Sequence, residues 1–297
     1  MGHTGVPSSQ TQCPREESES PEGRTFCVFQ PELGVSLHTV SNELTDRMLQ
    51  AIGSSRIATV EISARLLDGD QPGARVRLLK KQLERVGIRP MTIHARFGGA
   101  YDFSTLDQTA SQDAISAVGA SIDLASELEL PVLVVHASAE PVQPHERSRR
   151  LKQAQGALAQ IGEQCQKVGK KVAIELLPRS CLGNTVEELF ELVDGLPQDR
   201  FGFCLDTNHL MGRYRYLARD VHRMGHRLIA LHLSDYDGVD EKHRLPGKGV
   251  IDWRSFMGAL RDVDYGGPFN YECKLEGESV QERVRSLEEN FCWLCAL

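Results

Sequence analysis

Short apolar runs that end in an acidic residue or a histidine recur along this 297-residue chain, and they alternate with longer amphipathic segments. The run with the sharpest end is Phe-Gly-Phe-Cys-Leu at 201–205, which stops at Asp206-Thr-Asn-His209. A short apolar run is typical of a buried strand, whereas apolar residues every three or four positions are typical of a helix. The chain is therefore predicted to alternate strands with helices.

Eight strands are predicted, at residues 33–38, 56–62, 90–94, 131–136, 171–175, 201–205, 228–232 and 268–272. Helices are predicted at about 43–52, 71–86, within 105–127, 146–168, from 185 onward, 252–262 and 278–294. The spacing of Thr185 and Glu188 is that of a capping box. Eight strands alternating with helices over about 265 residues is the pattern and size of a (β/α)8 TIM barrel. A doubly wound open sheet would normally carry a Gly-rich phosphate loop after its first strand, and none is present.

Composition limits the class of protein further. Residues 1–27 are mostly polar and predict a disordered tail, and residues 28–297 predict a single barrel domain. The net charge of −7 without a basic stretch disfavours nucleic acid as a partner. No apolar stretch fits a signal peptide or a membrane span, and the eight cysteines form no paired framework. We therefore expect a cytoplasmic protein without a membrane partner.

Seven of the predicted strands end in a carboxylate or an imidazole: Glu61, His94, His136, Glu175, Asp206, His232 and Glu272, with His209 just past the sixth strand. In a barrel, the carboxyl ends of all strands lie on one face, where the active sites of this fold are found. Anionic and imidazole groups packed there without a cation would repel one another and lose hydration, at a cost of several kcal/mol. A divalent metal removes that cost. The sequence therefore predicts a metal site on this face.

The motifs around these strand ends resemble those of the xylose isomerase-like barrels. They are Ile174-Glu175 with Asn184-Thr185, Cys204-Leu-Asp-Thr-Asn-His209, Leu231-His-Leu-Ser-Asp235, His243-Arg-Leu-Pro-Gly-Lys-Gly-Val-Ile-Asp-Trp253 and Tyr271-Glu272. Over residues 31–295 the chain resembles, more narrowly, the sugar phosphate isomerase/epimerase group, which includes ketose 3-epimerases, hydroxypyruvate isomerases and inosose dehydratases. The abasic-site nucleases of the endonuclease IV type are cousins of this group. These motifs are specific to the superfamily and not to one substrate.

The resemblance implies a mechanism. Glu175, Asp206, His232 and Glu272 would hold one divalent ion, Mn2+, Mg2+, Co2+ or Zn2+, and His209 would touch a substrate oxygen. Glu175 and Glu272 would also act as acid and base, moving a proton of a small sugar, sugar phosphate or hydroxy-keto acid through an enediolate. The chain is accordingly predicted to be a metal-dependent isomerase or epimerase, with a homo-oligomer left open.

His94 and His136 leave an alternative. In the nuclease cousins, histidines at these strand ends complete a three-zinc cluster that activates a hydroxide on a phosphodiester, and His243 or Asp240 would complete the set here. In the sugar isomerases, such histidines contact substrate hydroxyls or phosphate instead. A zinc phosphodiesterase of the endonuclease IV type therefore stays an alternative, as does a related dehydratase or lyase.

Three further residues are candidates for substrate binding. His243 and Arg244 are both candidates for gripping the far end of the substrate. Glu61 either binds a substrate hydroxyl or pairs with a nearby base. The acidic surface favours a small molecule over DNA as the substrate.

Overall fold

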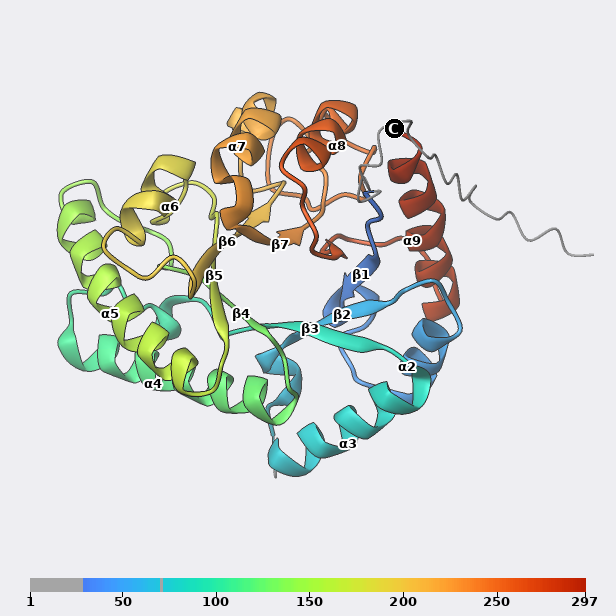
Figure 1. Ribbon diagram of the computed structural model, residues 1–297, viewed down its shortest axis with the longest axis horizontal. Helices are drawn as coiled ribbons and strands as arrows, with labels where there is room; N and C mark the ends of the chain where they lie inside the picture. Colours follow the sequence, from blue (N-terminus) through green and yellow to red (C-terminus); the bar gives the residue numbers. More distant parts are fainter. Residues whose placement is uncertain (1–28, 70–71) are drawn as a thin grey trace, which may run out of the picture.

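Eight parallel strands form a barrel in the computed structural model, which describes residues 29–69 and 72–297 (Figure 1). The strands are β1 (Leu33–Ser36), β2 (Thr59–Ser63), β3 (Arg89–His94), β4 (Val132–Val135), β5 (Lys171–Glu175), β6 (Phe201–Asp206), β7 (Leu228–His232) and β8 (Phe269–Tyr271). They pair in the order β7-β6-β5-β4-β3-β2-β1-β8. The tail predicted at residues 1–27 lies outside the described residues.

The barrel closes between β7 and β8, just past the end of β7. The amide of Leu233 donates to the carbonyl of Asn270 at 2.8 Å, and the amide of Glu272 donates to the carbonyl of Leu233 at 3.1 Å. These two bonds place Glu272 beside the end of β7. The contact that closes the barrel therefore places the end of β8 next to the end of β7, which carries His232.

Helices surround the barrel (Figure 1). They are α1 (Leu37–Val40), α2 (Asp46–Gly53), α3 (Pro72–Val86), α4 (Gln108–Glu127), α5 (Arg147–Lys167), α6 (Val186–Leu192), α7 (Leu217–Met224), α8 (Trp253–Asp262) and α9 (Val280–Cys295). Short 3-10 turns lie at Ala64–Leu67, Gly99–Tyr101, Met211–Tyr216 and Gly225–Arg227. None of the helices in the described residues is both long and apolar enough to cross a membrane.

Helix caps explain where the predicted bounds differ from the observed ones. α2 begins at Asp46 and not near residue 43, because the hydroxyl of Thr45 accepts from the amide of Met48. Thr185 caps α6 as expected, but the carboxylate of Glu188 does not complete the box. It accepts instead from the amide of Gly183 at 2.7 Å and pairs with Arg147 at 2.6 Å. The reciprocal capping box occurs at α9, between Ser279 and Glu282.

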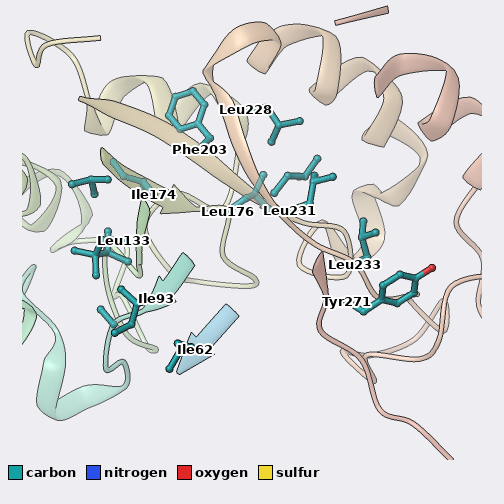
Figure 2. Packing of buried hydrophobic residues seen from close by; sticks show 14 of the residues in the cluster. Ile62, Ile93, Leu133, Ile174, Leu176, Phe203, Leu228, Leu231, Leu233 and Tyr271 are labelled. Atoms are coloured by element: carbon teal, nitrogen blue, oxygen red, sulfur yellow. The ribbon is translucent and has the colours of Figure 1, made fainter. Parts of the chain in front are cut away.

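Alternation along the strands separates two cores. Side chains on one face of the strands join the large apolar cluster beneath the helices, and Figure 2 shows some of them, including Ile62, Ile93, Leu133 and Ile174. The opposite face fills the barrel interior with a small cluster of Val134, Ala173, Cys204 and Ala230. Because side chains alternate with a period of two, the next inward positions after these four are His136, Glu175, Asp206 and His232. The strand-end polar residues therefore point into the barrel mouth.

The loop between β7 and α8 is held by one buried carboxylate. Asp235, at 0% exposure, accepts from the amides of Gly247 (2.7 Å) and Ile251 (3.2 Å) and from the indole nitrogen of Trp253 (2.9 Å). A Cβ at Gly249 would clash with the Asp235 carboxylate, so only glycine fits there. The Pro-Gly-x-Gly-x-Ile-Asp-Trp motif thus shapes the loop that carries His243.

Replacing Asp235 by alanine should destabilise the fold by about 3 kcal/mol or more, because three buried donors would lose their acceptor. Trp253→Phe removes only one of these donors and should cost roughly 1–2 kcal/mol. Urea unfolding followed by circular dichroism measures both. A loss below about 1 kcal/mol for Asp235→Ala would show that the carboxylate does not hold the loop.

Candidate active site

A hollow of about 310 Å³ opens at the carboxyl ends of the strands. Most of the site residues predicted from the sequence line it: His94, His136, Glu175, Asp206, His209, His243 and Glu272. His232, at 0% exposure, and Glu61, at 1%, lie buried in the barrel interior. The lining residues thus come from the ends of β3, β4, β5, β6 and β8 and from the loop after β7, as expected for this face of a barrel.

Four side chains in this region converge closely enough to hold a metal ion. Glu175, Asp206, His232 and Glu272 each offer one ligand atom, and these atoms all lie within 4.8 Å of one another. Oδ2 of Asp206 and Nδ1 of His232 are buried without a hydrogen bond of good geometry, although Nδ1 of His232 lies 2.6 Å from Oε2 of Glu272. Three carboxylates and one imidazole suit a divalent ion of the Mn2+, Mg2+, Co2+ or Zn2+ kind. The donor set therefore fits the metal expected from the sequence.

The backbone aims Asp206 at this set. Its Oδ1 accepts from the amides of Asn208 at 2.7 Å and His209 at 3.3 Å, in the turn that follows β6. The other oxygen, Oδ2, is left facing the cluster. The Asp-Thr-Asn-His turn therefore orients a ligand atom through local hydrogen bonds.

His232 is oriented by a second carboxylate. Its Nε2 bonds to Oε2 of Glu61 at 3.0 Å, and Glu61 is itself held by the hydroxyls of Thr92 (2.8 Å) and Ser36 (3.1 Å). Nδ1 of His232 then faces Oε2 of Glu272 at 2.6 Å and Oε1 of Glu175 at 3.4 Å. A carboxylate behind a ligand histidine fixes its ring and raises its basicity. Of the two roles considered for Glu61, the geometry matches pairing with a base.

Nearby histidines keep the carboxylates of Glu175 and Glu272 ionised. Burial by itself would raise the pKa of Glu175, but His136 and His232 hold it well below its usual range. Burial acts in the same direction on Glu272, whose pKa is kept well below its usual range by His232 and His38. For Asp206, burial prevails over the attraction of His209 and His243, so its pKa is raised. Protons on imidazoles whose pKa is raised, such as those of His94, His209 and His232, thus supply the positive charge that a metal ion could supply instead.

His94 and His136 flank Glu175 on one side. Each has its Nε2 3.0 Å from Oε2 of Glu175, and together the three form a second group with metal-ligand spacing. Nδ1 of His94 also bonds to the carbonyl of Ala95, so both ring nitrogens of His94 face acceptors. Burial by itself would lower the pKa of His94, but Glu175 raises it to about 9. Burial lowers the pKa of His136. The ring of Phe97 stacks on His136 with centroids 4.5 Å apart.

His209 and His243 flank Asp206 on the other side and form a third such group with it. A residue missed by sequence reasoning, Glu241, places Oε1 3.1 Å from Nε2 of His243 and 3.4 Å from Nε2 of His209. Its Oε2 lies 2.6 Å from Arg179, which also pairs with Asp240 at 2.8 Å. Asp240, considered from the sequence as a ligand, therefore faces Arg179, and its neighbour Glu241 is the acid that reaches the histidines.

His38 is a second residue that sequence reasoning missed. Its Nε2 lies 3.1 Å from Oε1 of Glu272, and its Nδ1 bonds to the hydroxyl of Ser36 at 2.9 Å. The first predicted strand was expected to end at His38, so the signal used for the other strand ends was present here too. The strand stops at Ser36, and the single turn of α1 carries His38 toward Glu272.

Arg244 lies outside the hollow. Its backbone pairs with that of Asp235, and its guanidinium approaches the carbonyl of Lys248 at 3.4 Å and the carboxylate of Asp237 at 3.7 Å. His243 is therefore the member of this pair that faces the site.

Residues 49–296 of the chain match a protein family described as xylose isomerase-like TIM barrel. A probable endonuclease 4 from Sulfurihydrogenibium sp. (strain YO3AOP1) is 22% identical over 230 residues, which make up 71% of this chain and 81% of that protein. A D-psicose 3-epimerase from Enterocloster bolteae is 34% identical over 113 residues, 37% of this chain and 35% of that protein. The crystal structure of a D-tagatose 3-epimerase-like protein superposes with a TM-score of 0.74 at 22% identity, covering 89% of this chain and 98% of that one.

Glu61→Gln should weaken binding of a divalent metal by about 10- to 100-fold while leaving the fold intact, because the amide no longer supports His232 with a full negative charge. Isothermal titration of the metal-stripped protein with Mn2+ or Zn2+ measures the change. Glu84→Gln, an exposed glutamate on α3, is the matched control and should bind like the parent. Equal affinities for Glu61→Gln and the parent would show that Glu61 plays no part in metal binding.

Proposed function

The chain belongs to the family of xylose isomerase-like TIM barrels, and we propose that it is a divalent-metal-dependent isomerase or epimerase of a small sugar, sugar phosphate or hydroxy-keto acid. The family membership and the barrel confirm the resemblance drawn from its motifs. The observation that carries the proposal is the pair of ionised glutamates, Glu175 and Glu272, that meet in one metal-ligand group from strands that are not neighbours. The similarity to a D-psicose 3-epimerase supports the same class of substrate.

In such a reaction, different residues of this chain would bind the ion, contact the substrate and move the proton. Glu175, Asp206, His232 and Glu272 would hold the ion, which when bound polarises a ketose carbonyl and acidifies the adjacent C–H. His209 and His243 line the same hollow and offer ring nitrogens to substrate oxygens. One glutamate takes the proton from the carbon beside the carbonyl, and the substrate becomes an enediolate. The other glutamate takes up a proton from a substrate hydroxyl or from solvent and delivers it to the opposite face or to the next carbon.

Burial makes carboxylates competent for this proton transfer. Glu175 is 1% exposed, and closure of the hollow by a substrate removes water from both glutamates. A carboxylate that loses its water becomes a stronger base toward a carbon acid held against it. A sugar-like partner fits this arrangement, while the cytoplasmic setting and a homo-oligomeric state stay predictions.

Glu272→Gln and Glu175→Gln should each abolish exchange of a substrate proton with solvent, lowering its rate by at least about a hundredfold, because each removes one proton carrier. Uptake of solvent deuterium by a panel of ketoses, followed by NMR, measures this. Glu278→Gln, an exposed glutamate close by in the chain, should exchange like the parent. Undiminished deuterium uptake in both hollow variants would exclude the glutamate pair as the proton carriers.

A second candidate function is a zinc-dependent phosphodiesterase, and a specific observation favours it. Two further donor groups flank the first one and share ligands with it: His94 and His136 share Glu175, and His209 and His243 share Asp206. Shared carboxylates between adjacent donor groups are the arrangement needed to bridge several metal ions. The similarity to a probable endonuclease 4 supports this alternative.

The number of bound ions separates the two candidates. If the isomerase proposal holds, elemental analysis of freshly purified protein should find one manganese, magnesium or cobalt ion per chain, and His136→Gln should keep that count. Two or three zinc ions per chain, with one fewer in His136→Gln, would contradict the isomerase proposal. Abasic-site DNA would then be the first substrate to test.

A further inference from the structure

A second hollow, of about 970 Å³, lies behind the loop that carries His243, and we propose that it binds a phosphate-bearing small molecule. The β7–α8 loop, the segment after β8 and the helix α9 form its walls. The volume is in the range of sites for small ligands. The proposal does not depend on which reaction the first hollow performs.

Uncompensated positive charge distinguishes this hollow. Four cationic side chains line it, Lys242, Arg244, Lys248 and Lys274, against two carboxylates, although the chain as a whole carries a net charge of −7. Among the residues that the structure describes, no carboxylate lies within ion-pairing distance of Lys248 or Lys274. Lys242 and Arg244 reach carboxylates only at 3.7 Å. Two unpaired lysines beside two loosely paired cations suit a phosphate group, whose oxygens accept several charge-assisted hydrogen bonds.

Hydrogen bonds and packing within the protein hold the walls of the hollow together without a ligand. The side chain of Asn290 on α9 accepts from the Tyr271 hydroxyl at 3.0 Å and donates to the carbonyl of Pro246 at 2.8 Å. The ring of Trp293 covers Gly247, where a Cβ would come within 2.7 Å of the indole. Trp293 is still 40% exposed and offers an aromatic wall. A rigid frame with a flat apolar wall beside cations suits a phosphate attached to a sugar or a base.

The wall between the two hollows separates this ligand from the reacting substrate. His243 lines the first hollow, while its neighbours Lys242 and Arg244 line the second. Glu272 lines the first hollow and Lys274 lines the second. The amide of Lys274 donates to the carbonyl of His243 at 2.6 Å, which closes the wall. A phosphate compound held by these cations is therefore a second ligand.

Fluorescence of Trp293 reports on this hollow directly, because the chain has two tryptophans and the other, Trp253, is buried at 3% exposure. The metal-stripped full chain is titrated with inorganic phosphate, ribose 5-phosphate and ADP in turn, at constant ionic strength. At least one of these probes should change the emission saturably. Comparing the three separates a free phosphate from a sugar phosphate and a nucleotide as the source of the ligand.

The double variant K248Q/K274Q should weaken that binding by about tenfold or more, because it removes two charge-assisted contacts. The control K81Q/K152Q makes the same change in net charge at exposed lysines on α3 and α5 and should bind like the parent. Trp293→Phe should lose the signal while Trp253 still emits. The absence of a saturable change with all three probes, or an equal effect of the two double variants, would overturn the proposal.

Discussion

The structure depends on neutralising three carboxylates that are enclosed in the barrel mouth. Glu175, Asp206 and Glu272 contribute ligand atoms within 4.8 Å of one another and of His232, at a depth where Glu175 and Asp206 are at most 1% exposed. Negative charges that are this close together and buried away from water destabilise a fold strongly unless cations lie among them. The surrounding imidazoles are the cations that the chain itself can supply. A divalent ion supplies the same charge in one place and leaves the imidazoles neutral, as ligands must be.

The barrel explains why successive strands each contribute a side chain to this cluster. Parallel strands all end on the same face, and an inward side chain recurs at every second residue. Small residues, such as Ala173, Cys204 and Ala230, fill the interior one level below the cluster, so the longer polar side chains above them can reach the centre. The outward positions of the same strands carry large apolar residues that pack under the helices (Figure 2). The same alternation therefore builds the core and places the site.

The sequence predicts the parts of this site that follow from strand periodicity. Glu175, Asp206 and His232 end apolar runs, and the rule that such ends converge is enough to bring them together. The role of Glu61 depends on which inward residue it faces across the barrel, and a partner 171 positions away does not follow from local pattern. Glu241 and Arg244 stand in a polar loop whose path is determined by Asp235, so their directions follow from that loop's tertiary hydrogen bonds. α7 has no predicted bounds, although its buried residues Leu217, Val221 and Met224 recur at helical spacing.

The two glutamates are not equivalent, and their surroundings favour different roles. Oε2 of Glu175 lies 3.0 Å from both His94 and His136, and its side chain is 2% exposed, so its lone pairs are already committed to neighbours. The side chain of Glu272 is 17% exposed and has His38, itself 36% exposed, as the partner of Oε1. A base must lie within hydrogen-bonding reach of the proton it removes, and it must be free to turn toward it. Both oxygens of Glu272 also have partners, with Oε2 2.6 Å from Nδ1 of His232, but Glu272 is the more exposed of the two. In the proposed reaction this exposure favours Glu272 as the first proton acceptor and Glu175 as the group that is anchored between its histidines.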